Sequence, residues 1–332
     1  MSTLSIIVPI YNGEKRIIKC LDSILNQSYE YLELIVLNDG SKDSSDQIVK
    51  DFLADYQRNC PDTNRKIVYE YHENQGVAKT RNYGISIATG EYVTFVDQDD
   101  YLPENYCMEY MQHVEDNSYD IVVGGYKRVS DDGKVSRVVS LTQEEWSRFV
   151  VTAPWAHVYK RSFLLSHGIE FLSTGLGEDI YFNVLAYSHT HNVKVISEAN
   201  YMWVDNPVSV SNSKQNVIRE DRNPLLLMNQ LIEKMPKENG ISYETLEFFF
   251  ARYVVWYFLF TVRGSKKEDI KRMYEELFLW LQEHFPNYIK NRNISLVRPK
   301  GEPFSIRVCV WGFYLLKRVG LLKSFLNLMS HL

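Results

Sequence analysis

The order of apolar and polar positions divides the chain into two parts. From Leu4 to about Val129, short apolar runs alternate with longer segments of helical periodicity. Runs such as LSIIVPI and YVTFV are apolar on nearly every residue, which is typical of strands covered on both faces. The segments between them, for example 14–27 and 44–57, are long enough to be crossover helices. The pattern predicts an α/β fold with a Rossmann-like, mostly parallel sheet.

A different pattern begins near Val210, where aromatic-rich helical segments such as 243–262 replace the alternation. We therefore predict two domains, a sheet domain over residues 1–212 and a helical C-terminal domain over 213–332. The run FFFARYVVWYFLFTV is shorter than the roughly 20 residues that a spanning helix needs, and it contains Arg252. No transmembrane helix is expected.

Composition limits the classes of protein and partner. The 332 residues are 45% hydrophobic and carry a formal net charge of -5, which indicates a globular protein with a sizeable core and no overall basic field for nucleic acid. The four cysteines form no C-x-x-C pair, and the N-terminus lacks the regions of a secretory signal. We therefore predict a reduced, cytoplasmic location and no nucleic-acid partner.

Polar residues follow three of the predicted strands, at the edge where open parallel sheets bind ligands. Asn12 follows the first and Asp39 the second, although the Asn-Asp-Gly-Ser run also suits a turn and a helix cap. Asp97, Asp99 and Asp100 follow a third strand, and carboxylates this close raise one another's pKa unless a cation or hydrogen-bond donors compensate. Mg²⁺ or Mn²⁺ is the simplest compensation, and it indicates a phosphate-bearing substrate.

Four motifs in sequence order carry a resemblance to a known family: IIVPIYNGE, LIVLNDGSKDSS, ENQGVAKTRNYGISIATGEYVTFVDQDD and GLGEDIYFN. Together they resemble the family 2 glycosyltransferases of bacteria, over roughly Ser2 to Asn212. The resemblance implies a glycosyltransferase A-type fold, a nucleotide-sugar donor that is most often UDP-linked, a divalent metal at an Asp-x-Asp motif, and inversion at the anomeric carbon. The C-terminal region shows only a general similarity to helical additions in such enzymes.

The resemblance also assigns residues to the donor. Asp39 would accept hydrogen bonds from the base, Arg81 would approach the base or the diphosphate, and Asp97 would face the ribose or the sugar. We place seven residues at the nucleotide-sugar: Pro9, Tyr11, Asn12, Asp39, Arg81, Asp97 and Gln98.

The metal would be held by Asp99. The run VDQDD leaves two interpretations open, in which the second carboxylate is either Asp97 or Asp100. Mn²⁺ or Mg²⁺ would act there as a Lewis acid that neutralises the leaving diphosphate. Many relatives add a histidine after the sheet domain, where this chain has Asp205 and Asn206. The metal would then depend on fewer protein ligands.

Inverting transfer also needs a base that accepts the proton of the attacking hydroxyl. Asp179, in the motif GED, resembles that base by position, and the alternative is a structural carboxylate at a helix N-terminus. Glu178 is the next candidate, and we assign Glu178 and Trp155 to the acceptor. Trp155 would either stack on a sugar ring or pack in the core. His157 is expected to be a surface or hydrogen-bonded structural residue.

The last stretch, residues 304–332, places four basic residues among aromatic residues and leucines. This composition is typical of an interfacial membrane helix, and core packing is the alternative. Peripheral membrane contact through the C-terminal region would put the protein at the inner face of the cell membrane.

The sequence thus predicts an inverting, metal-dependent hexosyltransferase. Its donor would be UDP-galactose or UDP-glucose, and its acceptor a glycan on a surface polysaccharide, a lipid carrier or a glycoprotein. Two alternatives remain. A sugar nucleotidyltransferase would need a Gly-rich, Arg-containing loop after the first strand, which VPIYNGE lacks. A non-catalytic partner subunit that only binds nucleotide-sugar would have lost the metal or base carboxylates, which are present.

Overall fold

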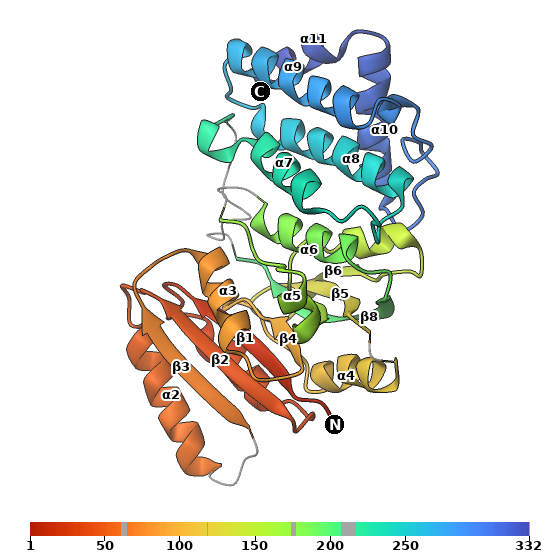
Figure 1. Ribbon diagram of the computed structural model, residues 1–332. Helices are drawn as coiled ribbons and strands as arrows, with labels where there is room; N and C mark the ends of the chain where they lie inside the picture. The colour runs from red at the N-terminus through yellow and green to blue at the C-terminus, as the bar shows by residue number, and fades with distance from the viewer. Residues whose placement is uncertain (61–64, 118, 174–176, 207–216, 332) are drawn as a thin grey trace.

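The computed structural model describes residues 1–60, 65–117, 119–173, 177–206 and 217–331. Its N-terminal part is a sheet with helices on both faces, and its C-terminal part is helical (Figure 1). The predicted domain boundary at 212/213 lies outside the described residues, as do the first residues of the GLGEDIYFN motif.

Eight strands form the sheet in the order β3-β2-β1-β4-β7-β5-β6, and β8 pairs with β5. The first four strands pair in parallel, as the alternating pattern predicts. The strand β7 is antiparallel to both β4 and β5, whereas β8 is parallel to β5. The strands are β1 (Leu4–Ile10), β2 (Leu32–Asp39), β3 (Lys66–His72), β4 (Tyr92–Phe95), β5 (Ile121–Val129), β6 (Val135–Val139), β7 (His157–Lys160) and β8 (Val193–Val204). The predicted mostly parallel, Rossmann-like sheet is confirmed.

Helices of the sheet part follow the predicted crossovers closely. They are α1 (Ile17–Leu25), α2 (Ser45–Asn59), α3 (Val77–Ile87), α4 (Tyr106–Asn117), α5 (Arg161–Ser166) and α6 (Glu178–Ser188), with a 3₁₀ turn η1 (Glu145–Phe149). A Cβ at Gly84 of α3 would come within 2.6 Å of Ile7 Cγ2, so this glycine lets α3 pack closely on β1.

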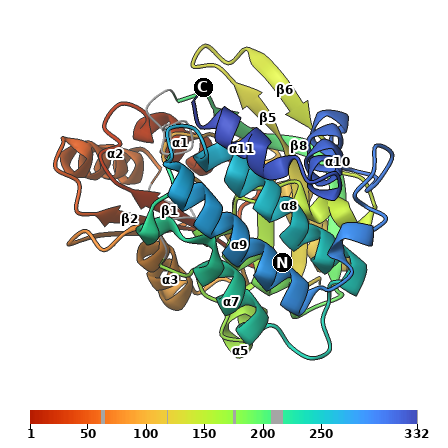
Figure 2. The ribbon, with the colours of Figure 1, turned by 90° about the horizontal axis from the view of Figure 1, so that it is seen from above.

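The C-terminal region is helical, as predicted. It contains α7 (Pro224–Lys234), α8 (Tyr243–Thr261), α9 (Lys267–His284), α10 (Phe304–Arg318) and α11 (Leu322–Met329), with 3₁₀ turns η3 (Glu220–Arg222) and η4 (Tyr288–Lys290). Seen from this end, α8 and α9 run side by side (Figure 2). No helix in the described part of the chain is both long and apolar enough to cross a bilayer.

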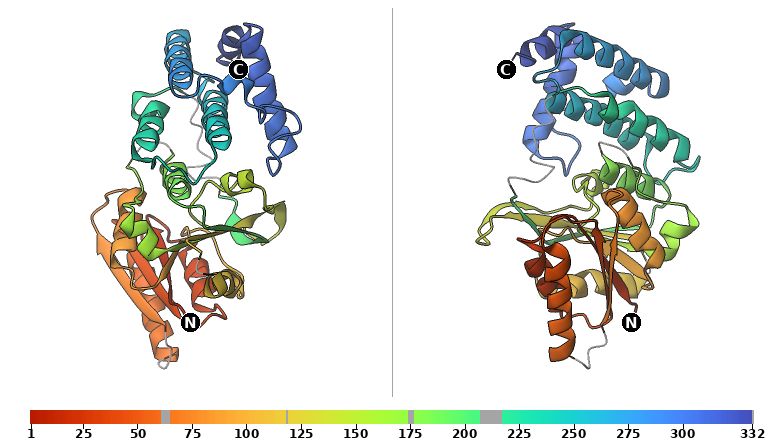
Figure 3. Two further views of the ribbon diagram at one scale, coloured as in Figure 1. Left: turned by 45° about the vertical axis from the view of Figure 1, so that its right-hand side comes forward. Right: turned by 90° about the vertical axis from the view of Figure 1, so that its left-hand side faces the viewer.

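Alternate residues of the central strands face two hydrophobic cores. Ile6 and Val8 of β1 pack against α1, α2 and α4 on one face. Ile7 and Phe95 lie in the other core, which continues through α6 to Phe248 of α8. The helical region therefore shares a core with the sheet and stands beyond α6 (Figure 3).

Candidate functional site

The loops after β1 and β2 are joined by side-chain hydrogen bonds to the backbone. The backbone nitrogen of Asn12 donates to Ser41 Oγ at 3.0 Å, and Asn12 Oδ1 accepts from the backbone of Lys42 at 2.8 Å. The next backbone nitrogen, that of Gly13, donates to Ser45 Oγ at 2.8 Å. Asn12 has a φ of 51°, a left-handed conformation that asparagine tolerates better than most residues. The two loops thus form one wall.

Gln98 connects this wall to the end of β4. Its Oε1 accepts from the backbone nitrogen of Tyr11 at 2.9 Å, and its Nε2 donates to the Tyr11 carbonyl at 3.0 Å. A Cβ at Gly13 would lie 2.4 Å from Gln98 Oε1, so only glycine allows this contact. The Tyr11 ring is exposed, whereas Pro9 is buried inside β1.

A cavity of about 670 Å³ lies against this wall, within the size range of small-molecule and cofactor sites. Lys15, Arg16 and Lys42 bring positive charge to it, although Arg16 is ion-paired with Asp131 at 2.7 Å. The cavity is lined by Asn12, Gly13, Glu14, Lys15, Arg16, Lys42, Asp43, Gln98, Asp99 and Asn206. Glu14, Asp43 and Asp99 bring negative charge to the same cavity, so its lining carries charge of both signs.

Asp39 lies at the end of β2, but its carboxylate is bonded to the chain. Oδ1 accepts from the backbone nitrogen of Gln75 at 2.8 Å, and Oδ2 accepts from that of Gly76 at 3.0 Å. The side chain is buried. The Asp39 carboxylate therefore connects the end of β2 to the start of α3. A nucleotide base could hydrogen-bond only to the lone pairs of this carboxylate that the two backbone amides leave free.

Arg81 of α3 joins two of the predicted carboxylates. Its guanidinium contacts Asp97 at 2.8 Å and Asp179 at 2.6 Å, and the arginine is only 4% exposed. Burial alone would lower the pKa of Arg81, but the two carboxylates raise it above its ordinary value. Arg81 and Asp97 belong to one sequence motif and Asp179 to another, and the fold brings the three side chains together.

Burial raises the pKa of Asp179 to about 7. Arg81 opposes this rise, whereas the negative charges of Glu178 and Asp97 add to it. Asp179 lies in the first turn of α6. The N-cap of this helix is Gly177, which has no side chain to cap the free backbone N–H groups. A carboxyl that titrates near neutrality at the wall of a cavity is suited to proton transfer.

The adjacent aspartates have different surroundings. Asp100 is 1% exposed, and its two oxygens accept from Tyr201 Oη at 2.7 Å and from the backbone of Val204 at 2.8 Å. Asp99 lines the cavity and accepts from Asn206 Nδ2 at 2.9 Å. Burial raises the pKa of Asp99, and the nearby Asp97 raises it further. Both candidates for the second carboxylate of VDQDD therefore have partners: Asp100 is bonded to β8, and Asp97 is ion-paired with Arg81 at 2.8 Å.

A smaller cavity of about 240 Å³ lies on the other side of Asp99. Asp97, Asp99 and Asp179 line it together, opposite an aromatic wall of Tyr126 and Trp203. The rest of its lining is Val150, Val151, Thr152, Ala153 and Trp155. Asp99 therefore belongs to both cavities, which puts the junction between them at the acidic residues.

Trp155 packs in the core and also lines the smaller cavity. It is 7% exposed and stacks on Tyr201 with ring centroids 4.5 Å apart, as a core residue would, yet its edge lines the smaller cavity. Glu178 neighbours Asp179 in the chain but is not among the residues that line either cavity.

Three other residues differ in how well the sequence predicted their positions: His157 was considered, whereas Tyr126 and Trp203 were not. His157 is fully buried and bonded to Tyr187 Oη at 2.6 Å, and burial lowers its pKa to about 4, as expected of a neutral structural histidine. Tyr126 and Trp203 were missed because they lie on β5 and β8, and no local motif marks these strands as neighbours of the site.

The donor set is compatible with a divalent metal. Among the described residues, no three or more His, Cys, Asp and Glu side chains are grouped as a metal site. Mg²⁺ commonly takes one or two carboxylates and fills its remaining positions with water and substrate phosphates. Asp99 supplies such oxygens at both cavities and Asp97 at the smaller one, and burial raises the pKa of Asp99, with the charge of Asp97 adding to the rise.

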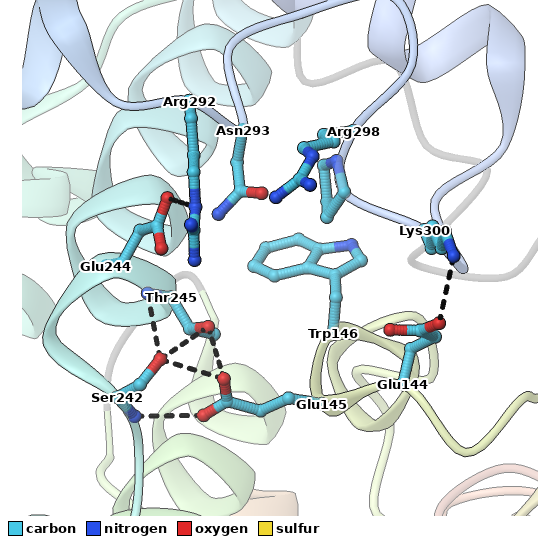
Figure 4. A pocket seen from close by; sticks show the side chains of 11 residues that line it. Glu144, Glu145, Trp146, Ser242, Glu244, Thr245, Arg292, Asn293, Arg298 and Lys300 are labelled. Atoms are coloured by element: carbon cyan, nitrogen blue, oxygen red, sulfur yellow. Dashed lines mark hydrogen bonds and ion pairs between the residues drawn. The ribbon is translucent and has the colours of Figure 1, made fainter.

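Another polar cavity, of about 250 Å³, lies where η1 meets α8 and residues 291–300 (Figure 4). Four of its charged groups form two pairs, Glu244 with Arg292, and Glu144 with Lys300 at 3.8 Å. Glu145 Oε2 accepts from Ser242 Oγ at 2.8 Å. We interpret this cavity as part of the junction between the sheet part and the helical region.

Fold and site define a class: an α/β protein of the nucleotide-sugar transferase type, with acidic residues at the carboxyl edge of its sheet. Comparison with known proteins agrees, because residues 5–169 match the family described as glycosyl transferase family 2. This chain belongs to glycosyl transferase family 2, and the resemblance found in its motifs is confirmed.

Two bacterial glycosyltransferases are among the similar proteins. The chain is 31% identical to glycosyltransferase GlyA of Streptococcus pneumoniae over 60% of this chain and 30% of that protein. It is 31% identical to the uncharacterized glycosyltransferase EpsJ of Bacillus subtilis, over 63% of this chain and 62% of the other. The matches thus span less than two thirds of either relative. The structure of S. aureus TarS 1-349 in complex with UDP-GlcNAc superimposes with a TM-score of 0.70 at 20% identity, over 99% of this chain and 90% of that one, and it shows the same fold.

Proposed function

We propose that this protein is an inverting, metal-dependent glycosyltransferase that moves a hexose from a UDP-sugar to a hydroxyl of a glycan acceptor. One observation carries the proposal: Asp97, Asp99 and Asp179 line a single cavity, and Arg81 holds the first and the last of them. A transferase of this kind needs a site for the leaving diphosphate and a base for the acceptor, on opposite sides of the transferred sugar.

The larger cavity is the proposed donor site. Lys15 and Lys42 would face the diphosphate, and Asp99 with Asp97 would hold Mn²⁺ or Mg²⁺ beside it. When bound, the metal would stabilise the negative charge that develops on the leaving diphosphate. Asn12 and Gln98 would keep the wall of this cavity in place, and Tyr11 would border the nucleotide through its exposed ring.

The smaller cavity is the proposed site of the reacting sugar and acceptor. Asp179 would accept the proton of the acceptor hydroxyl at its carboxylate, and Arg81 would keep that carboxylate oriented. Trp203 and Tyr126 supply aromatic faces on which a sugar ring stacks well. The acceptor would be a glycan on a surface polysaccharide, a lipid carrier or a glycoprotein.

UDP-glucose and UDP-galactose remain the proposed donors. UDP-GlcNAc belongs in the same screen, because a structural neighbour of the same fold holds it. A cytoplasmic location is part of the proposal, and its support is that all four cysteines are free.

The test combines donor binding with turnover. We expect one UDP-sugar to be hydrolysed slowly, and transferred to a suitable acceptor, only with Mn²⁺ or Mg²⁺ present. Asp99→Ala should weaken metal-dependent donor binding in calorimetry and lower turnover by roughly a hundredfold or more, since a metal contributes several kcal/mol of charge stabilisation. The control Asp51→Ala removes an exposed carboxylate from α2 and should behave like the wild type.

The alternatives give different results in the same assays. Full turnover in excess chelator would contradict the metal. Formation of a nucleotide-sugar from UTP and a sugar phosphate would identify a nucleotidyltransferase, and tight donor binding without hydrolysis or transfer would identify a partner subunit.

A further inference from the structure

Helix α10 presents an exposed face that carries no charged side chain. We call it the apolar face of α10, defined by Phe304, Val308, Gly312, Leu315 and Val319 at its C-cap. With 3.6 residues per turn, the spacings of four and three place these residues on one side of the helix. Phe304 is 62% exposed and Val319 is 57% exposed, which is unusual for large apolar side chains.

The opposite side of α10 is the side that packs. Val310, Phe313 and Tyr314 are buried in the core shared with α8, and Tyr314 Oη donates to the Ala251 carbonyl at 2.9 Å. Core packing therefore accounts for one side of this helix and leaves the apolar face without a partner among the described residues.

The apolar surface continues beyond α10. Leu321 and Leu328, before and within α11, are 55% and 64% exposed. A cavity of about 190 Å³ between α8 and α10 lies on the packed side of α10, near Cys309 and Val310, and is separate from the apolar face. Four exposed large apolar side chains on one side of α10 are nevertheless more than the scattered single apolar residues that water-exposed surfaces normally carry.

The charge of this segment identifies the partner that fits. After Glu302, which is itself buried, the sequence contains no Asp or Glu, although the whole chain has a formal net charge of -5. Its basic side chains are Arg307, Lys317, Arg318 and Lys323. Arg307 and Arg318 follow the apolar face along one edge, by their positions on the helical repeat. An apolar face bordered by basic side chains is complementary to a surface that has anionic groups at the water interface and an apolar interior behind them.

We propose that the apolar face of α10 docks on the surface of an anionic lipid bilayer. The apolar side chains would enter the boundary between headgroups and acyl chains, and Arg307 and Arg318 along the edge of the face would contact the headgroups, whereas Lys317 packs over Phe278 and Lys323 pairs with Glu275. A second copy of the chain fits less well, because pairing two such faces would bring their basic edges together. The helical region stands at the opposite end of the molecule from α2 and β3, so docking there leaves the sheet clear of the membrane (Figure 1). The proposal does not depend on the transfer reaction.

Vesicle flotation of the full chain tests the proposal. We expect the protein to float with vesicles of phosphatidylcholine and phosphatidylglycerol, to bind phosphatidylcholine vesicles weakly, and to be released from the anionic vesicles by salt. Leu315→Glu should lower partitioning about tenfold, because it places a charge within the apolar face. Phe304→Ser, at the most exposed position of the face, should also weaken binding without endangering folding.

A matched control is Leu165→Glu, which makes the same change at a 49% exposed leucine of α5 in the sheet part. It should partition like the wild type. Equal partitioning of Leu315→Glu, Leu165→Glu and wild type would overturn the proposal, as would absence of binding at every anionic lipid content. A dimer in sedimentation that Leu315→Glu dissociates, without any vesicle binding, would assign the face to a second copy instead.

Discussion

At the scale of single residues, Arg81 organises the site. A buried guanidinium needs partners for its charge, and here it has two carboxylates from different elements, Asp97 after β4 and Asp179 in α6. One side chain thus fixes the relative position of the proposed donor and acceptor groups. A change at Arg81 would disturb both, so the individual roles are better tested at the carboxylates.

Asp179→Asn separates a base from a structural carboxylate. The amide preserves the shape and still accepts a hydrogen bond from Arg81, but it cannot take a proton. If Asp179 is the base, the transfer rate should fall by on the order of 10² to 10⁴-fold while donor affinity and melting temperature stay close to wild type. Normal transfer by a folded Asp179→Asn protein would remove Asp179 from the mechanism and make Glu178 the next candidate.

The pKa of Asp179, raised to about 7, predicts a pH dependence. A general base works in its deprotonated form, so kcat/KM for transfer should rise with pH through about 7 and level off above it. Glu178 contributes to the raised pKa of Asp179, so Glu178→Gln should move the rise to lower pH. The control Glu144→Gln, in the junction with the helical region, should leave the profile in place. A profile that Glu178→Gln does not shift would contradict this account.

At the scale of elements, the site depends on how loops are tied to strand ends. The wall formed by the β1 and β2 loops is held by bonds such as Asn12 to Ser41, and the start of α3 is held to β2 by Asp39. In these hydrogen bonds Asn12 and Asp39 contact the protein backbone or a loop side chain, although the sequence motif alone would assign both residues to the ligand. A residue that binds the ligand and a residue that holds a loop in place give different results on mutation, because the first lowers ligand affinity and the second lowers stability.

Asp39→Ala tests this division. Loss of the two backbone bonds to Gln75 and Gly76 should lower the free energy of unfolding by about 1 to 2 kcal/mol, because the loop amides are near solvent and regain water in part. Asp39→Asn keeps one acceptor oxygen and should cost less. Urea unfolding measures the loss, and UDP titration measures the ligand role. Unchanged stability with lost UDP affinity would make Asp39 a nucleotide ligand alone.

At the scale of the whole molecule, the sheet part and the helical region are joined by buried polar contacts as well as by a common core. Glu302 accepts from Trp146 Nε1 at 2.7 Å and pairs with Arg252 Nε at 2.7 Å. Trp146 belongs to η1, directly before the residues that line the smaller cavity. A deletion from Lys300 onward would remove Glu302 and the buried residues of α10, so point variants are the cleaner test.

Glu302→Ala should lower the free energy of unfolding by about 2 to 3 kcal/mol, because it leaves Arg252 and the indole nitrogen without their acceptor. This is less than a fully buried pair would cost, since the Arg252 side chain is 23% exposed. Urea unfolding should remain a single transition, as a continuous core requires. The matched control Glu144→Ala breaks a pair with Lys300 whose side chains are 50% and 76% exposed, and it should change stability by less than about 0.5 kcal/mol. Two separate transitions in wild type would contradict a shared core.

The sequence by itself determined the parallel part of the sheet, the helical C-terminal region and a minority of the residues that line the two cavities, namely Asn12, Asp97, Gln98, Asp99, Trp155 and Asp179. The reason is local: continuous apolar runs identify doubly covered strands, and polar residues at their ends mark the ligand edge. It could not choose between Asp97 and Asp100 as the partner of Asp99, because adjacent carboxylates look alike until β8 supplies Tyr201 Oη and the backbone of Val204 to one of them.

Only the tertiary structure decided which distant groups meet. Arg81 and Asp179 are 98 residues apart, and their ion pair depends on α3 and α6 reaching the same edge of the sheet. Tyr126 and Trp203 reach the smaller cavity through the pairing of β5 with β8, a contact between strands that no local pattern encodes. The tertiary structure also decided which side of α10 is buried. The composition of this helix suited both core packing and membrane contact, and its packing on α8 buries one side and leaves the apolar face exposed.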